Sequence, residues 1–145
     1  MKTNKIKTIC LLTAILLSAI CLISSCSDDD NDEFSIIGKW NVDRVTDIGK
    51  IDGEVDSHNI YLNVGTITFE GDGSGIIKES ADGFTDEFRW TLRSNELIFT
   101  WVGGSDDGFT TVYKLEIISP RKIELESTEI HGNLELIEIM ELTKI

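Results

Sequence analysis

The chain has 145 residues, of which 26 are Asp or Glu and 13 are Lys or Arg, and its formal net charge is −13. This length suits a single globular domain. A chain so acidic repels nucleic-acid phosphates and anionic membrane surfaces, so we expect no nucleic-acid partner.

Residues 1–25 have the composition of a secretory signal peptide. Lys2, Lys5 and Lys7 precede an almost wholly apolar run over residues 9–23, and small residues follow it. The run is shorter than the roughly 20 residues that a membrane-spanning helix needs. We therefore predict a leader that is removed, which would make the mature chain more acidic by three charges.

The leader ends at a cysteine whose context suggests lipidation. Ile23-Ser24-Ser25-Cys26 resembles the lipobox of bacterial lipoproteins, in which the cysteine is acylated and becomes the new N-terminus. The resemblance implies a lipid anchor of the palmitate type on Cys26, and two or more acyl chains anchor stably. The alternative is ordinary secretion with Cys26 as an unpaired thiol. Because Cys10 and Cys21 lie in the leader, the mature chain can form no disulfide and no cysteine metal site.

An acidic spacer, residues 26–35, separates this cysteine from the domain. Its run Ser27-Asp28-Asp29-Asp30-Asn31-Asp32-Glu33 self-repels and has little to bury, so we predict an extended tether. A solvated linker is one interpretation. The stretch is also similar to the signal that sends lipoproteins of the Bacteroidota to the outer face of the outer membrane, which implies display at the cell surface.

Residues 36–145 show the period-two alternation that is typical of strands, with no competing helical period. The first strand is predicted from Trp40 to Thr46. We predict an irregular loop over Asp47–Asn63, which mixes glycines and acids, with Ile60–Leu62 as a short strand inside it.

The segments that follow read as hairpins, because glycine-containing turns join alternating runs. Pro120 is predicted to end a strand, since proline lacks the backbone donor. In the last strand the alternation slips between Leu136 and Ile137, which predicts a bulge. The predicted strands lie at 65–70, 75–80, 88–93, 97–101, 110–118, around 123–125, and at 134–143, and a flexible acidic loop occupies 103–108.

Eight such strands, each with one apolar face, predict an all-β fold, an antiparallel up-and-down eight-stranded barrel. Closure buries the apolar face and removes the sheet edges, and a two-sheet sandwich is the alternative. The predicted inward residues are Trp40, Val42, Ile67, Phe69, Phe88, Trp90, Leu92, Leu97, Phe99, Trp101, Tyr113, Leu115, Ile117, Ile123, Leu125, Met140 and Leu142.

Three motifs in order carry a resemblance. Gly38-Lys39-Trp40, then Thr68-Phe69 with Gly73 and Gly75, then Phe88-Arg89-Trp90-Thr91-Leu92, are similar to the pattern of lipocalin-like lipoproteins of the Bacteroidota. The resemblance covers residues 36–145 and implies a lipocalin-like barrel. It further implies that Trp40 closes the barrel floor, that a basic side chain of a late strand, Arg121 or Lys122, stacks on it, and that the loop after the first strand is a lid.

The inward aromatic residues allow two interpretations. They either fill the core or line a cavity for a small apolar ligand. The candidate lining residues are Phe69, Phe88, Trp90, Phe99, Trp101 and Tyr113. The alternative function is a protein-interaction or inhibitor module that acts through exposed loops 47–63 and 103–108.

Enzymatic chemistry has little support in the sequence. His58 and His131 lie in predicted loops without metal-ligand spacing, and no serine stands in a nucleophile-elbow context. The acidic turns Asp72–Gly75 and Asp106–Gly108 lack the alternating acids of a calcium loop, so turn chemistry explains them. We expect no catalysis, no metal and no cofactor.

Overall fold

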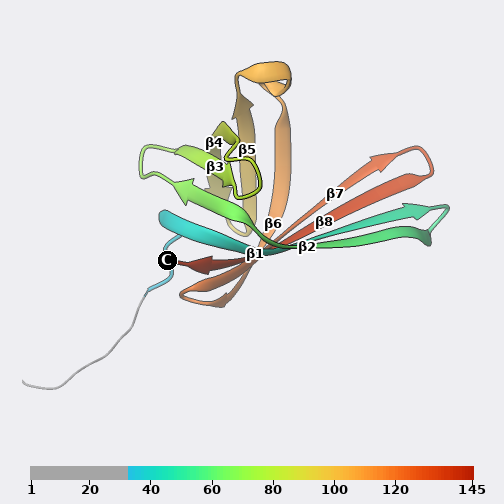
Figure 1. Cartoon of the computed structure of the whole chain (residues 1–145), viewed down its shortest axis with the longest axis horizontal. Helices are drawn as coiled ribbons and strands as arrows, with labels where there is room; N and C mark the ends of the chain where they lie inside the picture. The colour runs from blue at the N-terminus through green and yellow to red at the C-terminus, as the bar shows by residue number, and fades with distance from the viewer. Residues whose placement is uncertain (1–32) are drawn as a thin grey trace, which may run out of the picture. The chain divides into compact units, whose positions relative to one another are not determined.

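The computed structural model describes residues 33–145, and they form a closed barrel (Figure 1). Each strand pairs antiparallel with the next one in the chain, and β8 pairs with β1. The predicted all-β up-and-down barrel of eight strands is therefore confirmed. The strands are β1 (Gly38–Ile51), β2 (Glu54–Phe69), β3 (Ser74–Glu79), β4 (Thr85–Arg93), β5 (Glu96–Val102), β6 (Thr110–Ser119), β7 (Lys122–His131) and β8 (Leu134–Lys144), with a 3-10 turn, η1 (Gly104–Asp106), between β5 and β6.

The predicted leader and the lipidation site Cys26 lie outside the described residues. Within residues 33–145, no helix is long and apolar enough to cross a membrane.

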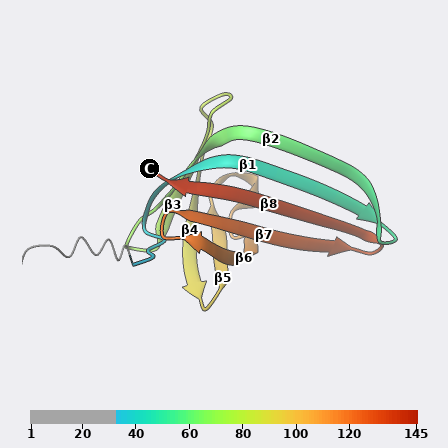
Figure 2. The ribbon, with the colours of Figure 1, turned by 90° about the horizontal axis from the view of Figure 1, so that it is seen from below.

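Four strands are long and project together. Figure 2 shows β2, β1, β8 and β7 side by side, extending beyond the short strands β3 and β4. The tips of their two hairpins are joined, because the Asp52 amide donates to the Asn133 carbonyl at 3.0 Å. We call this part the four-stranded extension, formed by residues 44–62 of β1 and β2 and residues 127–139 of β7 and β8.

The prediction of an irregular loop over Asp47–Asn63 is wrong. β1 continues to Ile51 and β2 begins at Glu54, so the segment is a hairpin. Asp52 (φ 52°) and Gly53 (φ 83°) form its turn, and two consecutive positive φ angles match the twist of flanking strands. The alternation was hidden because every residue from 54 to 63 is exposed, so neither face of that part of β2 needs to be apolar.

The bulge is also misplaced in the prediction. β8 pairs without a register shift at Leu136 and Ile137, whereas β1 has one between Val42 and Arg44. The displaced residue is Asp43, whose carboxylate accepts hydrogen bonds from Asn41 at 2.6 Å and Thr143 at 2.6 Å. Because of this shift, Val45, Asp47 and Gly49 lie on the inner face of the barrel.

The barrel core is filled with aromatic and aliphatic side chains. The predicted inward residues are buried or packed against the core, with the exception of Ile117, which is 50% exposed near the end of β6. The rings of Phe88 and Phe99 stack at 4.3 Å, and Phe69 meets both of them edge-on. Such offset and edge-to-face contacts add stability beyond burial alone.

Trp40 lies near the start of β1, at the end of the barrel that the core side chains fill, which we call the closed end. It is fully buried, and its indole N–H donates to the Ile36 carbonyl at 2.7 Å. The basic residue over its ring is Lys144, with Nζ 5.4 Å from the ring centroid, rather than Arg121 or Lys122. Gly38 adopts φ +125°, which favours glycine, and a Cβ there would press on the Lys144 side chain at 3.0 Å.

Candidate functional site

Residues directly opposite each other in neighbouring strands point to the same side of a sheet. Such rows of inner residues can be followed across β2, β1, β8 and β7. The rows nearest the closed end are apolar: Val42, Leu142 and Ile123 form one, and Val45, Met140 and Leu125 form the next with Tyr61. The inner surface then changes character in a single step.

The next row is polar in all four strands. Asp47 pairs with Asn59 on one side and with Glu138 on the other, and Glu138 pairs with Ser127. We call these four residues, Asn59, Asp47, Glu138 and Ser127, the polar row. Beyond it, Gly49 stands between Ser57 and Leu136, and Leu136 pairs with Glu129.

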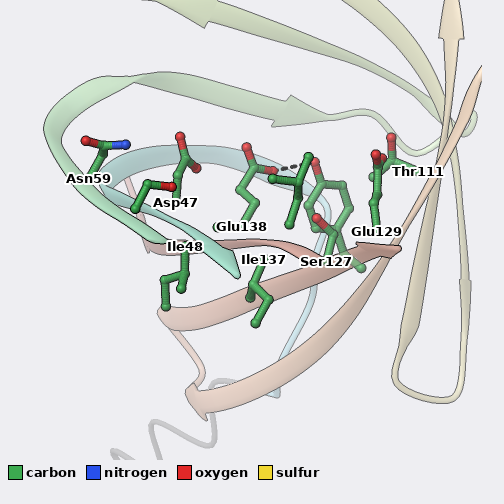
Figure 3. A pocket seen from close by; sticks show the side chains of 12 residues that line it. Asp47, Ile48, Asn59, Thr111, Ser127, Glu129, Ile137 and Glu138 are labelled. Atoms are coloured by element: carbon green, nitrogen blue, oxygen red, sulfur yellow. Dashed lines mark hydrogen bonds between the residues drawn. The ribbon is translucent and has the colours of Figure 1, made fainter. Parts of the chain in front are cut away.

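A cavity of about 450 Å³ opens over the polar row. Figure 3 shows Asp47, Asn59 and Glu138 directed to one side of the strands, while Ile48 and Ile137 point to the other. The side chains that face the cavity are therefore mostly polar. Its lining residues are Asp47, Ile48, Gly49, Ser57, Asn59, Thr111, Tyr113, Ser127, Glu129, Leu136, Ile137 and Glu138.

Tyr113 joins the aromatic core to the cavity. Its ring centroid lies 5.0 Å from that of Phe99, and its hydroxyl donates to Glu138 Oε1 at 2.9 Å, the dashed line in Figure 3. A buried tyrosine places an apolar ring and a polar tip in different surroundings. Tyr113 thus lies where the packed core ends and the polar cavity begins.

The electrostatics of this pair follow from burial and from neighbouring acids. Burial raises the pKa of the Glu138 carboxyl; the hydrogen bond from Tyr113 lowers it in part, and the charges of Asp47 and Glu129 raise it again. Burial also raises the pKa of the Tyr113 phenol, and the charge of Glu138 adds to this shift. The phenol therefore stays protonated and acts as a hydrogen-bond donor.

Ser127 is the buried polar residue of the cavity. It is 8% exposed as a residue and lines the cavity, and within residues 33–145 its hydroxyl bonds to no other side chain. Since no fully buried side-chain oxygen or nitrogen within residues 33–145 lacks a hydrogen-bond partner, the Ser127 hydroxyl is accessible from the cavity, where water or a ligand can bond to it. Its position in the polar row directs it to the space over Glu138.

Of the six predicted lining residues, Tyr113 borders this cavity. Phe69, Phe88 and Phe99 are at most 1% exposed in the core, and Trp90 and Trp101 pack partly buried against it. Phe88 and Trp101 also border two smaller hollows, of about 270 and 280 Å³. The aromatic set thus mainly fills the barrel, the first of the two interpretations.

The remaining polar features follow simpler chemistry. His58 and His131 lie on strands rather than in loops, and both are exposed, His131 3.3 Å from Glu129. Asp72 accepts hydrogen bonds from the backbone and hydroxyl of Ser74, and Asp107 accepts one from the Gly103 amide, as turn residues do. In the described part of the chain, no group of three His, Cys, Asp or Glu residues is arranged to hold a metal ion.

The polar row was not predicted from the sequence. Its signal was available in β7 and β8, where the inward series changes from Ile123 and Leu125 to Ser127, and from Leu142 and Met140 to Glu138. Aligning these two changes with Asp47 of β1 requires the register across the bulge at Asp43. The sequence alone did not supply that register.

No family model and no curated protein matches this chain. Solved structures resemble it in fold. A lipocalin-like protein from Bacteroides uniformis has 14% identity and a TM-score of 0.49, over 76% of this chain and 98% of that one. An uncharacterized protein from Bacteroides eggerthii has 16% identity and a TM-score of 0.42, over 73% and 99%. A redesigned beta barrel has 17% identity and a TM-score of 0.43, over 76% and 91%. The barrel assignment itself rests on the strand pairing.

Proposed function

We propose that the protein is a non-catalytic barrel, held to the outer membrane by a lipid on Cys26, that binds one small polar molecule in the cavity over the polar row. The observation that carries the proposal is this cavity of about 450 Å³, which lies within the usual size range of small-molecule pockets. The packed core below it provides a rigid support, as binding sites generally require.

The lining favours a polar ligand over the apolar one that the sequence suggested. The inner rows at this level present carboxylates, hydroxyls and an amide. An apolar molecule would strip water from these groups without replacing its hydrogen bonds, which costs affinity. The aromatic residues that would have favoured an apolar ligand pack mainly against one another in the core.

Binding, rather than catalysis, agrees with the residue types present. No histidine, lysine or cysteine is among the residues that line the cavity. Burial raises the pKa of the Tyr113 phenol, so this group cannot act as a base near neutral pH. What the lining offers is a set of fixed hydrogen-bonding groups.

Native mass spectrometry of the protein purified from its own cells tests the binding function. A co-purifying small molecule is expected, and it should be lost from a Ser127→Leu variant, which fills the cavity. Thr128→Leu is the matched control, because Thr128 is the next residue of β7 and is exposed on the opposite face. A barrel that is consistently empty, or a ligand retained equally by both variants, would contradict the proposal.

The membrane anchor is proposed from Cys26 and its sequence context. Labelling of cells with a palmitate analogue should mark the wild-type protein and not a Cys26→Ala variant. Surface protease treatment of intact cells should then remove the domain, as display on the outer face requires. A Cys26→Ala protein that stays in the outer-membrane fraction would contradict the anchor.

A protein-interaction role is the second candidate function. The surface that would bind the partner is a strand, β2, rather than a loop. Val55, Ile60 and Leu62 on the outer part of β2 are 55–67% exposed. That part of β2 pairs with β1 and, within the described residues, with no strand on its other side. Exposed edges of this kind accept an added strand. A partner whose binding survives an Ile60→Lys, Leu62→Lys double variant would exclude this surface.

A further inference from the structure

The charge of the cavity indicates the chemical class of its ligand, whereas the cavity volume indicates only the size of that ligand. Asp47, Glu129 and Glu138 all line it, and no basic side chain is among the lining residues. Arg44 pairs with Glu141 and Lys50 with Glu135, none of which lines the cavity. Glu129 has the exposed His131 at 3.3 Å, and this histidine is not among the lining residues either. The carboxylates of the cavity therefore have no cationic partner among the residues that line it.

The hydrogen-bonding capacity of the cavity is biased toward acceptors. The Tyr113 hydroxyl proton is already donated to Glu138 Oε1, which leaves the other carboxylate oxygen of Glu138 available. Carboxylates accept hydrogen bonds and donate none when ionised. A ligand that satisfies this site must bring donors and positive charge.

A neutral hydroxyl lies beside these acids. Ser127 is 8% exposed as a residue and lines the cavity, and its hydroxyl bonds to no other side chain within residues 33–145, so it is open to a molecule in the cavity. Ser127 stands directly opposite Glu138, the carboxylate that Tyr113 holds in place. One ligand atom over this pair could meet a carboxylate oxygen and a hydroxyl together.

We infer that the cavity binds a small organic cation, a molecule with a protonated amine and neighbouring hydroxyl groups. The inference rests on the proposed binding function and names its ligand class. The ammonium group, with three donors and no acceptor, lies between Asp47 and Glu138. A hydroxyl of the ligand meets Ser127.

A metal ion fits this site less well than an organic cation. Metal ions need several oxygen ligands within about 2.0–2.6 Å of one point. In residues 33–145, no three acids or histidines converge in this way. A cavity of about 450 Å³ has room for an organic molecule, whose separate groups can reach acids that lie on different strands.

The titration of Glu138 agrees with this ligand class. Burial and the charges of Asp47 and Glu129 raise the pKa of Glu138, while Tyr113 from β6 partly lowers it. A positive group placed among these acids would favour the ionised carboxylate. The like charges that face one another in the free protein would then be compensated on binding.

Calorimetric titration of the full-length protein in detergent with matched probes tests the inference. Glucosamine is compared with glucose and glucuronate, and tyramine with its neutral alcohol analogue, 2-(4-hydroxyphenyl)ethanol. The amine of at least one set should bind at least about tenfold more tightly than its neutral analogue, the loss expected when one charged hydrogen bond is removed. Glucuronate should not bind.

Glu138→Gln and Asp47→Asn should each weaken amine binding by about tenfold or more. The matched control is Glu141→Gln, three residues along β8, whose carboxylate pairs with Arg44 and Lys122 outside the cavity; it should change binding by less than about twofold. Equal binding of amine and neutral probe, no binding of any amine, displacement of the amine by calcium, or full binding by Glu138→Gln would each overturn the inference.

The failure of this inference is distinguishable from failure of the binding function. If a neutral probe binds and Ser127→Leu abolishes its binding, the cavity binds ligands but its ligand is not a cation. If no probe binds and the native protein is empty, the binding function itself fails.

Discussion

The two ends of the barrel are built from the same strands, but one end is an apolar core and the other is a polar cavity. At the closed end, β1 and β8 contribute Trp40, Val42 and Leu142, which are at most 3% exposed. Farther along, the same two strands contribute Asp47 and Glu138 to a cavity. The change occurs within one row of paired residues and in four strands at once.

The contrast shows how a small barrel can hold partly buried acids at one end. A packed apolar core supplies most of the stability of a domain of this size. Groups that serve binding are commonly less than optimal for stability. The closed end should therefore dominate unfolding, and the polar end should contribute little to stability or oppose it.

The largest expected effect is at the closed end. Trp40→Ala should destabilise the protein by about 3–5 kcal/mol, because it removes a fully buried ring and leaves a cavity. Urea unfolding followed by circular dichroism measures this loss. A Trp40→Ala variant that is folded and undiminished in stability would show that this residue does not support the barrel.

The packing of the core can be tested by adding one methyl group. Gly75→Ala should cost about 1–3 kcal/mol, because its Cβ would meet the Phe88 ring at 2.2 Å. Gly71→Ala is the control, since the nearest atom to its Cβ is a side-chain carbon at 3.8 Å, an ordinary contact. Equal unfolding midpoints for the two variants would mean that the core is not filled at Phe88.

The hairpin of the extension should be sensitive at its turn. Gly53→Ala should cost about 1–2 kcal/mol locally, since Gly53 has a positive φ of 83° that alanine adopts poorly. Hydrogen exchange should accelerate in residues 47–62 and remain unchanged in the core. Uniform acceleration would indicate that the extension and the core unfold as one unit.

The smallest expected effect is a gain in stability rather than a loss. The pKa of Glu138 is raised above its ordinary value of 4.5 in the folded protein. Between the unfolded and folded pKa values the folded state binds more protons, so its stability falls as pH rises through that interval. Glu138→Gln keeps an acceptor for Tyr113 without the charge, and should raise the melting temperature at pH 7 by a few degrees.

A second variant, measured in the same thermal melts, is compared with Glu138→Gln. Glu141→Gln, which removes a partly exposed ion pair with Arg44, should lower the melting temperature slightly or leave it unchanged. The two glutamates lie on the same strand, and only Glu138 lines the cavity. A stability loss for Glu138→Gln equal to that of Glu141→Gln would contradict the proposal that the cavity acids oppose folding.

Much of the barrel could be predicted because most of its strands have one dry face. Phe88, Trp90 and Leu92 alternate with polar residues, and glycines stand where the chain reverses, as at Gly73 and Gly83 (φ 83° and 73°). The extension could not be predicted in the same way, since residues 54–63 of β2 are exposed to solvent on both faces. The pair Asp52-Gly53 was the local signal for that hairpin, and it is one of the strongest hairpin signals known.

The cavity could not be predicted because it depends on which residues face each other. Asp47, Glu138 and Ser127 are far apart in the sequence, and each alone resembles an ordinary surface position. The bulge at Asp43 changes which residues of β1 face inward, so alternation counted from Trp40 would have turned Asp47 outward. Side-chain identity was visible in the sequence, but the cross-strand register was not.

The most direct test of the two-ended barrel is where its natural ligand makes contact. Nuclear Overhauser effects can be measured between the molecule that co-purifies with the protein and protons of assigned side chains. We predict contacts with Ser127, Tyr113 and Glu138. Contacts confined to the rings of Phe69 and Phe88, or to Ile60 on the outer face, would contradict this prediction.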